Sequence, residues 1–101
     1  MDMGKMMKEL QKMQSKMAKL QSEMEMTVFE AEAGGGAVKV TLNGKGDLQA
    51  VRLQKEVVDP DDVEALEDLI LAAFQSAKEK VDSAQQQKFG GMTKGLGIPG
   101  F

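Results

Sequence analysis

The stretch 37–53, AVKVTLNGKGDLQAVRL, decides the fold of this chain. Val38, Val40 and Leu42 alternate with polar residues, which is typical of a strand with one buried face. Turn residues at 43–47 then interrupt the pattern, and the Asn-Gly pair there can adopt positive φ. A second apolar stretch follows directly, so this segment predicts an antiparallel hairpin.

A further strand precedes the hairpin. Residues 27–33 also alternate, with Ala31 and the residues two positions away on one face, and the glycines at 34–36 predict a turn. The third strand covers 48–53. Because the connections are short, neighbouring strands must run antiparallel. Residues 27–54 therefore predict a three-stranded antiparallel meander.

The segment 1–26 predicts a long helix. Apolar residues recur there at spacings of three and four over about three heptads, which indicates an amphipathic helix with one apolar face. We call this face the apolar seam. Its members are Met3, Met6, Leu10, Met13, Met17, Leu20 and Met24.

The seam is too long for one small sheet to cover. Twenty-three helical residues extend about 35 Å, whereas three strands are only about 10 Å across between their outer axes. An exposed apolar stripe is unusual on a monomer, and the open sheet edges also invite pairing. We therefore predict a homodimer; the alternative is that the second helix covers the seam within one chain.

The second helix is predicted over 59–89. Asp59 can cap it, Pro60 suits its first position, and Gly90-Gly91 should end it. The tail 90–101 is too rich in Gly and Pro for regular structure. Its apolar residues that could dock elsewhere are Leu96, Ile98 and Phe101.

These elements predict an α+β fold of the order α-β-β-β-α. Neither a repeat nor a change in composition divides the sequence, so residues 1–101 are expected to form a single domain. Together with the seam, this architecture predicts a small domain that assembles as a homodimer.

Composition excludes several classes of function. The 101 residues include no Cys, His, Trp or Tyr and only four Phe. Disulfides, thiolate sites and histidine catalysis are therefore absent, and stacking platforms for single-stranded nucleic acid are scarce. No apolar run approaches the roughly 18 residues of a membrane span. Without the apolar region of a signal peptide, the expected location is the cytoplasm.

Candidate chemical motifs are weak. The turn 44–46 lacks the frame of a phosphate loop, and the acids of 59–64 lack the spacing of a calcium loop. Glu30 and Glu32 share a strand face without other polar partners. Methionine at helical spacing fits packing better than copper binding. We predict no catalytic residue, metal, cofactor or small-molecule substrate, and hence no enzyme.

Lysines form the main candidate site. They fall within an arc of roughly 80° on the first helix, centred about 125° from the apolar seam. Thirteen basic and 16 acidic residues give the chain a net charge of -3, yet residues 1–20 carry five lysines against two acids and residues 59–89 three lysines against eight acids. The candidate DNA-binding residues, which we call the lysine row, are Lys5, Lys8, Lys12, Lys16 and Lys19.

A lysine row suits phosphate better than base edges, because ammonium is a point charge. Arg52 is the single arginine of the chain, so little guanine recognition is expected. We therefore predict duplex DNA binding with weak sequence preference. Two alternatives stay open: an acidic, Met-rich adaptor for proteins that does not bind DNA, and an RNA-binding protein, since phosphate contacts alone do not separate the nucleic acids.

Four segments together resemble the YbaB/EbfC family of bacterial nucleoid-associated proteins, over nearly the whole chain. The resemblance implies a small cytoplasmic homodimer that binds DNA and coats the nucleoid, with an α-β-β-β-α fold and paired helical arms. It implies that the arms bind DNA, which points to the lysine row and secondarily to Lys78, Lys80 and Lys88. The four segments are GKMMKELQKMQSKMAKLQSEM, AVKVTLNGKGDLQAVRL, DPDDVEALEDLILAAFQSA and GGMTKGLGIPGF.

Overall fold

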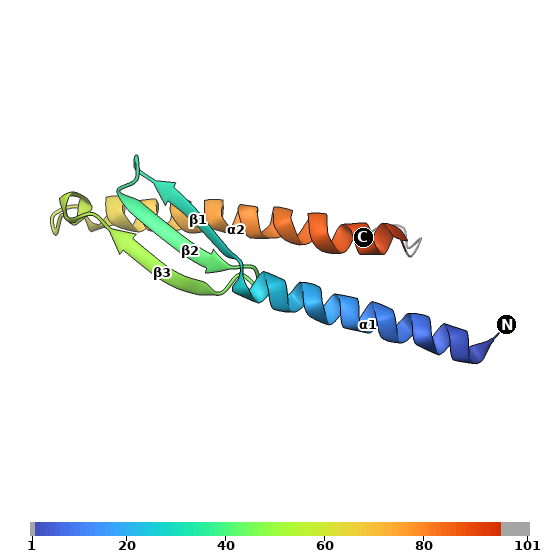
Figure 1. Cartoon of the computed structure of the whole chain (residues 1–101). Coiled ribbons are helices and arrows are strands. Elements are labelled where there is room, and N and C mark those ends of the chain that lie inside the picture. Colours follow the sequence, from blue (N-terminus) through green and yellow to red (C-terminus); the bar gives the residue numbers. More distant parts are fainter. Residues whose placement is uncertain (1, 96–101) are drawn as a thin grey trace.

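Two helices flank a three-stranded sheet in the order that the sequence predicts (Figure 1). The computed structural model describes residues 2–95, and it describes side chains for residues 2–90. The predicted α+β class and the α-β-β-β-α order are confirmed. The elements are α1 Met3–Met26, β1 Val28–Ala33, β2 Val38–Asn43, β3 Leu48–Leu53, the short 3-10 helix η1 Lys55–Val57 and α2 Val63–Gly95.

The sheet is the predicted antiparallel meander, with β2 in the centre. Ala31 of β1 pairs with Val40 of β2, which pairs in turn with Val51 of β3. A register shift after Thr41 brings Leu42 opposite Leu48. Because paired residues point to the same face of a sheet, these pairs align the apolar face across all three strands.

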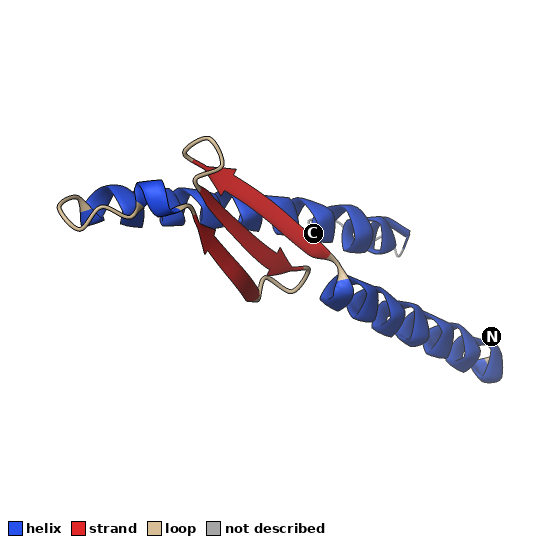
Figure 2. Cartoon of the chain, turned by 60° about the vertical axis from the view of Figure 1, so that its left-hand side comes forward, coloured by secondary structure: helices blue, strands red, loops and turns tan. Residues whose placement is uncertain are grey.

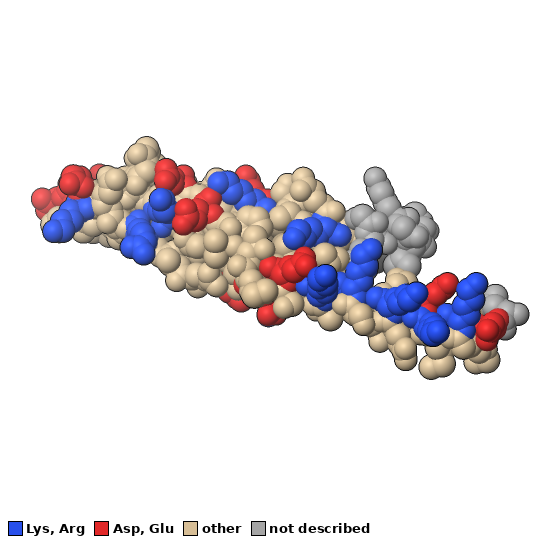
Figure 3. All heavy atoms as spheres, viewed as in Figure 1, with Lys and Arg blue, Asp and Glu red and all other residues tan. Residues whose placement is uncertain are grey.

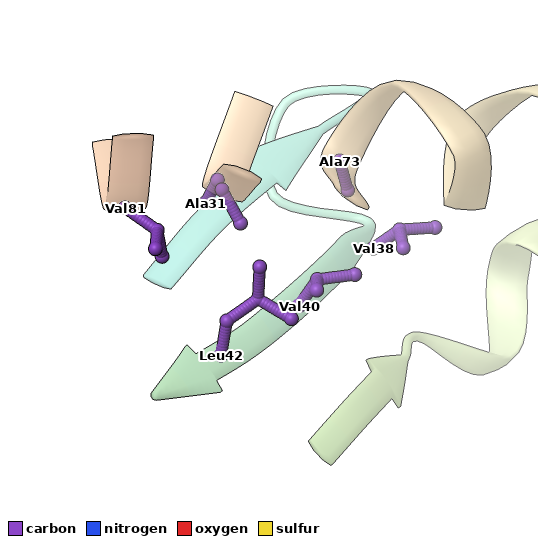
Figure 4. Close-up of a cluster of buried hydrophobic side chains, with 7 residues drawn as sticks. Ala31, Val38, Val40, Leu42, Ala73 and Val81 are labelled. Atoms are coloured by element: carbon purple, nitrogen blue, oxygen red, sulfur yellow. The ribbon is translucent and has the colours of Figure 1, made fainter. Parts of the chain in front are cut away.

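The core lies between this face and α2 (Figure 4). Val40 and Leu42 of β2 are fully buried, as are Ala73 and Ala77 of α2. The alanines leave little bulk between helix and sheet, which lets the two backbones approach closely. The alternation read from the sequence therefore predicted the buried face of the sheet correctly.

The β2–β3 turn differs from the prediction in its backbone. Positive φ occurs at Gly46, at 89°, and at neither Asn43 nor Gly44. The buried Asn43 instead organises the turn: its Oδ1 accepts hydrogen bonds from the N–H of Lys45 at 2.9 Å and of Asp47 at 3.0 Å. An asparagine that bonds the backbone ahead of it can form a turn without a left-handed conformation of its own.

The start of α2 corrects a prediction. Asp59 does not cap the helix; its Oδ1 accepts from the N–H of Asp61 at 2.9 Å, and its carbonyl accepts from the N–H of Asp62 at 3.0 Å. These bonds form a turn around Pro60. The helix begins at Val63, and Asp62 takes the capping role by accepting from the N–H of Ala65 at 3.3 Å.

The C-terminal end of α2 also differs from the prediction. The helix does not stop at Gly90-Gly91 but continues to Gly95. A glycine stop requires a left-handed residue, and Gly90 is not among the described glycines with positive φ. The predicted docking of Leu96, Ile98 and Phe101 lies outside the described residues.

Gly90→Ala is expected to stabilise the protein by about 1 kcal/mol, because alanine favours a helix interior over glycine by that amount. A Cβ at this position meets no atom within 4 Å, so no clash offsets the gain. Urea unfolding at fixed protein concentration measures the effect. A loss of stability would show instead that the helix ends at Gly90 in a left-handed conformation.

α1 projects away from the sheet, and we refer to it as the arm (Figures 1 and 2). The molecule measures 71 × 25 × 16 Å along its principal axes. Met24 at the base of the arm is buried, whereas Met3, Met6 and Leu10 are exposed. Within residues 2–95, α2 therefore does not cover the outer part of the apolar seam.

Candidate nucleic-acid interface

The β2–β3 turn holds the base of the arm. The N–H of Gly44 donates to the carbonyl of Met24 at 2.8 Å. This contact is backbone to backbone, and a Cβ on Gly44 would overlap with that same carbonyl. The turn therefore fixes the position at which the arm leaves the body.

Side chains add to this attachment. Gln85 of α2 donates from Nε2 to the carbonyl of Gly44 at 2.7 Å. Lys45 lies 3.3 Å from Glu25, and Lys88 lies 4.0 Å from Glu23. These ion pairs are partly exposed, so each contributes at most about 1 kcal/mol. These ion pairs affect the position of the arm more than the stability of the fold, because they connect the arm to both the turn and α2.

This attachment was not predicted from the residues. Gly44 was expected only as a turn residue, and Gln85, which lies 41 residues away in the sequence, had no predicted role. The Asn-Gly pair gave a signal for a turn, but a turn signal does not reveal which backbone passes close to it. Only the folded chain brings the arm, the turn and α2 together.

The lysine row occupies one exposed side of the arm, where Figure 3 shows blue side chains following one another. All five lysines are exposed. In the described part of the chain, none of these ammonium groups lies within ion-pair distance of a carboxylate. The row covers fourteen helical steps, or about 21 Å. It thus offers unpaired positive charge over several phosphate spacings of a nucleic acid.

Most of the acidic residues of 59–89 lie far from this charge, at or before the start of α2. Asp59, Asp61 and Asp62 lie just before α2, at the end of the molecule opposite the arm (Figure 1). Charges interact over about 8–10 Å at physiological ionic strength, a distance much shorter than the 71 Å long axis. A molecule with a negative total can therefore present a positive arm.

The three lysines of α2 do not extend the row in the same way. Lys80 donates to the carbonyl of Glu30 at 2.6 Å, which attaches it to β1. Lys88 lies beside Glu23, as described above. Lys78 is exposed on α2. Lys80 and Lys88 thus have partners among the described residues, whereas the lysines of the row have no carboxylate partner there.

Other chemistries find little support among residues 2–95. No three acidic side chains there converge on a point that could hold a metal ion. Glu32, considered above for acid-base work, lies 3.5 Å from Lys39 on the neighbouring strand. Neither described helix has the length and hydropathy to cross a bilayer.

Comparison with known proteins identifies the family to which this chain is similar. The model of the YbaB/EbfC DNA-binding family matches residues 1–96. A nucleoid-associated protein of Clostridium perfringens is 51% identical over 100 residues, which cover 99% of this chain and 89% of that protein. One from Streptomyces avermitilis is 44% identical over 103 residues, covering 99% and 91%.

A solved structure shows the same fold. The crystal structure of the uncharacterized protein HP0035 from Helicobacter pylori superposes with a TM-score of 0.81, covering 91% of this chain and 97% of that one. Its sequence identity is 23%, so this likeness concerns the fold alone. The family model and the relatives agree, and the chain belongs to the YbaB/EbfC DNA-binding family.

Proposed function

We propose that this protein is a nucleoid-associated homodimer that binds duplex DNA mainly through phosphate contacts, with little sequence preference. The lysine row is the observation that carries the proposal: five exposed lysines on one side of a projecting helix, none of them ion-paired within the described residues. The relatives named as nucleoid-associated proteins support a nucleoid location. The binding residues are Lys5, Lys8, Lys12, Lys16 and Lys19.

The mechanism is electrostatic. Each lysine that neutralises a phosphate releases condensed counterions, so affinity falls as salt rises. Two fully engaged rows would contact about ten phosphates and give a log-log salt slope near -9. Arg52, the residue type best suited to reading guanine, lies on β3 rather than on the arm. Base recognition therefore has few side chains to depend on.

Binding isotherms on unrelated duplexes over a range of salt test this function. We expect similar affinities for all duplexes and a steep loss as salt increases. A matched RNA duplex in the same assay separates DNA binding from RNA binding. No binding at low salt would contradict the proposal and favour the protein adaptor.

The proposed dimer uses the uncovered part of the sheet. α2 packs on β1 and β2, and leaves the apolar residues of β3 open on the same face. Leu48 is 55% exposed, Val51 40% and Leu53 41%. With Leu71 of α2, which is 55% exposed, we call these residues the open face.

The open face is also hollow. A cavity of about 320 Å³ separates β3 from the flank of α2, between Val51 and Leu71. Because α2 packs along β1 and β2, the third strand lies beyond the edge of the helix. We expect the α2 helix of a second copy to pack on β3 and fill this cavity. A twofold axis would place each Leu71 against the other copy's β3, which gives a self-complementary interface.

Leu71→Asp is expected to weaken the dimer by roughly 100-fold or more, because burial of an unpaired carboxylate costs at least about 3 kcal/mol. Sedimentation equilibrium measures the change. Ala72→Asp is the matched control: it adds the same charge at the neighbouring exposed position, turned about 100° around the helix. Equal dimer affinity in both variants would rule out the open face as the interface.

A further inference from the structure

The arm and α2 lie side by side at one end of the molecule (Figures 1 and 2). Contacts at the base set their alignment, because Gln85 bonds the same Gly44 whose N–H bonds Met24. A cavity of about 590 Å³ opens between the two helices beyond this point. Its walls include Met17 of the arm and Phe89 of α2. The space between the helices is therefore partly apolar and accessible.

The alignment shows how far α2 accompanies the arm. From Gln85 to Gly95 the helix advances about 15 Å. The same distance along the arm, measured from Met24 toward the N-terminus, covers ten residues and reaches Gln14. The arm continues farther than α2, as Figure 1 also shows. The outer arm therefore has no helix beside it, and its apolar residues there are exposed. They are Met3, Met6, Met7 and Leu10, which we call the outer seam.

Six residues, 96–101, follow Gly95 in the sequence. Extended, they reach about 20 Å, and Met3 at the far end of the outer seam lies about 17 Å along the arm from the level of Gln14. Pro99 lacks an N–H, and proline disfavours a helix interior. Every second or third residue is apolar: Leu96, Ile98 and Phe101.

We propose that residues 96–101 dock on the outer seam of their own chain. The segment starts where α2 leaves the arm unaccompanied, it is long enough, and its apolar side chains match an exposed apolar surface. Methionine suits such a surface, because its flexible thioether adapts to irregular partners. The lysine row is centred about 170° around the helix from the outer seam, at about 100° per residue. Docking thus covers the apolar side of the arm and leaves the basic side open.

Methionine oxidation by hydrogen peroxide tests the proposal without DNA. The peroxide transfers one oxygen to the thioether and leaves water, and peptide mass spectrometry follows each site. Met3 and Met26 are a matched pair, 77% and 75% exposed at opposite ends of the arm. In the full chain we expect Met3 and Met6 to oxidise at least about threefold more slowly than in a Leu96→Ser, Ile98→Ser, Phe101→Ser variant, since docking shields them. Met26 should oxidise equally in both. Equal rates for Met3 in the two proteins would overturn the proposal.

Engineered cysteines identify which chain supplies the segment, since the natural chain has none. With Leu10→Cys and Ile98→Cys, oxidised glutathione should close a disulfide within one chain, which runs as a monomer on a non-reducing gel. The control pairs Ile98→Cys with Gln49→Cys, an exposed position on β3, and should stay open. A disulfide between chains would overturn the proposal and assign the segment to a second copy.

Discussion

Replacing Lys8, Lys12 and Lys16 together with alanine is expected to weaken duplex DNA binding by about 10²–10³-fold per engaged arm at 0.1 M salt. Each phosphate contact contributes about 0.9 to the salt slope, so the loss of three should reduce the slope by about 2.7 for one arm and 5.4 for two. The three side chains are exposed and unpaired among the described residues, so the fold should not change. Fluorescence anisotropy over a range of salt gives both quantities.

A second triple variant controls for total charge. Lys39, Arg52 and Lys55 lie on the body, and their replacement by alanine removes the same three charges. We expect a much smaller change in affinity and slope, because these side chains lie away from the row. If the two variants lost the same affinity, net charge rather than the arm would govern binding. If the arm variant lost none, the lysine row would not be the site.

Gly44→Ala is expected to produce the largest loss of stability, about 3 kcal/mol or more. The added Cβ would overlap with the Met24 carbonyl, and both partners are backbone, so no side-chain rotation relieves the contact. The arm must then shift away from the β2–β3 turn. For a domain of this size such a loss lowers the melting temperature by more than about 10 °C. Calorimetry measures it, and hydrogen exchange at Gly44 reports the loss of its bond to Met24.

Gly46→Ala is the control for this clash, because it measures the cost of a left-handed turn residue where no atoms overlap. Gly46 has a φ of 89°, and a Cβ there meets nothing within 4 Å. Its replacement should cost about 1–2 kcal/mol, the cost of a left-handed conformation. An equal loss in both variants would mean that the contact between Gly44 and Met24 does not hold the arm.

Several features followed from the residues because they depend on local periodicity. Alternation across Val38, Val40 and Leu42 identified the buried face of β2, and the spacing of lysines on α1 placed the row on one side of the helix. The short connections required antiparallel pairing. These predictions need no knowledge of distant contacts, and the elements they concern were found where expected.

The ends of α2 were harder to predict, because neighbouring residues competed for the same roles. Asp59 and Asp62 are both able to cap, and the turn around Pro60 used the first carboxylate. Gly90 disfavours a helix by only about 1 kcal/mol, which is too little to stop one that is already formed. The capping preferences of the two aspartates, and the helix propensity of Gly90, differ too little between the alternatives to predict where the helix begins and ends.

The sequence determined the order of the elements, the buried face of the sheet and the row of charge on the first helix. The tertiary structure decided how much of each apolar surface stays open. It placed α2 over β1 and β2, left β3 uncovered, and joined Gly44 to Met24 so that the arm projects. Periodicity fixes which side of an element is apolar, whereas coverage depends on the relative placement of elements distant in sequence, which a few specific contacts decide.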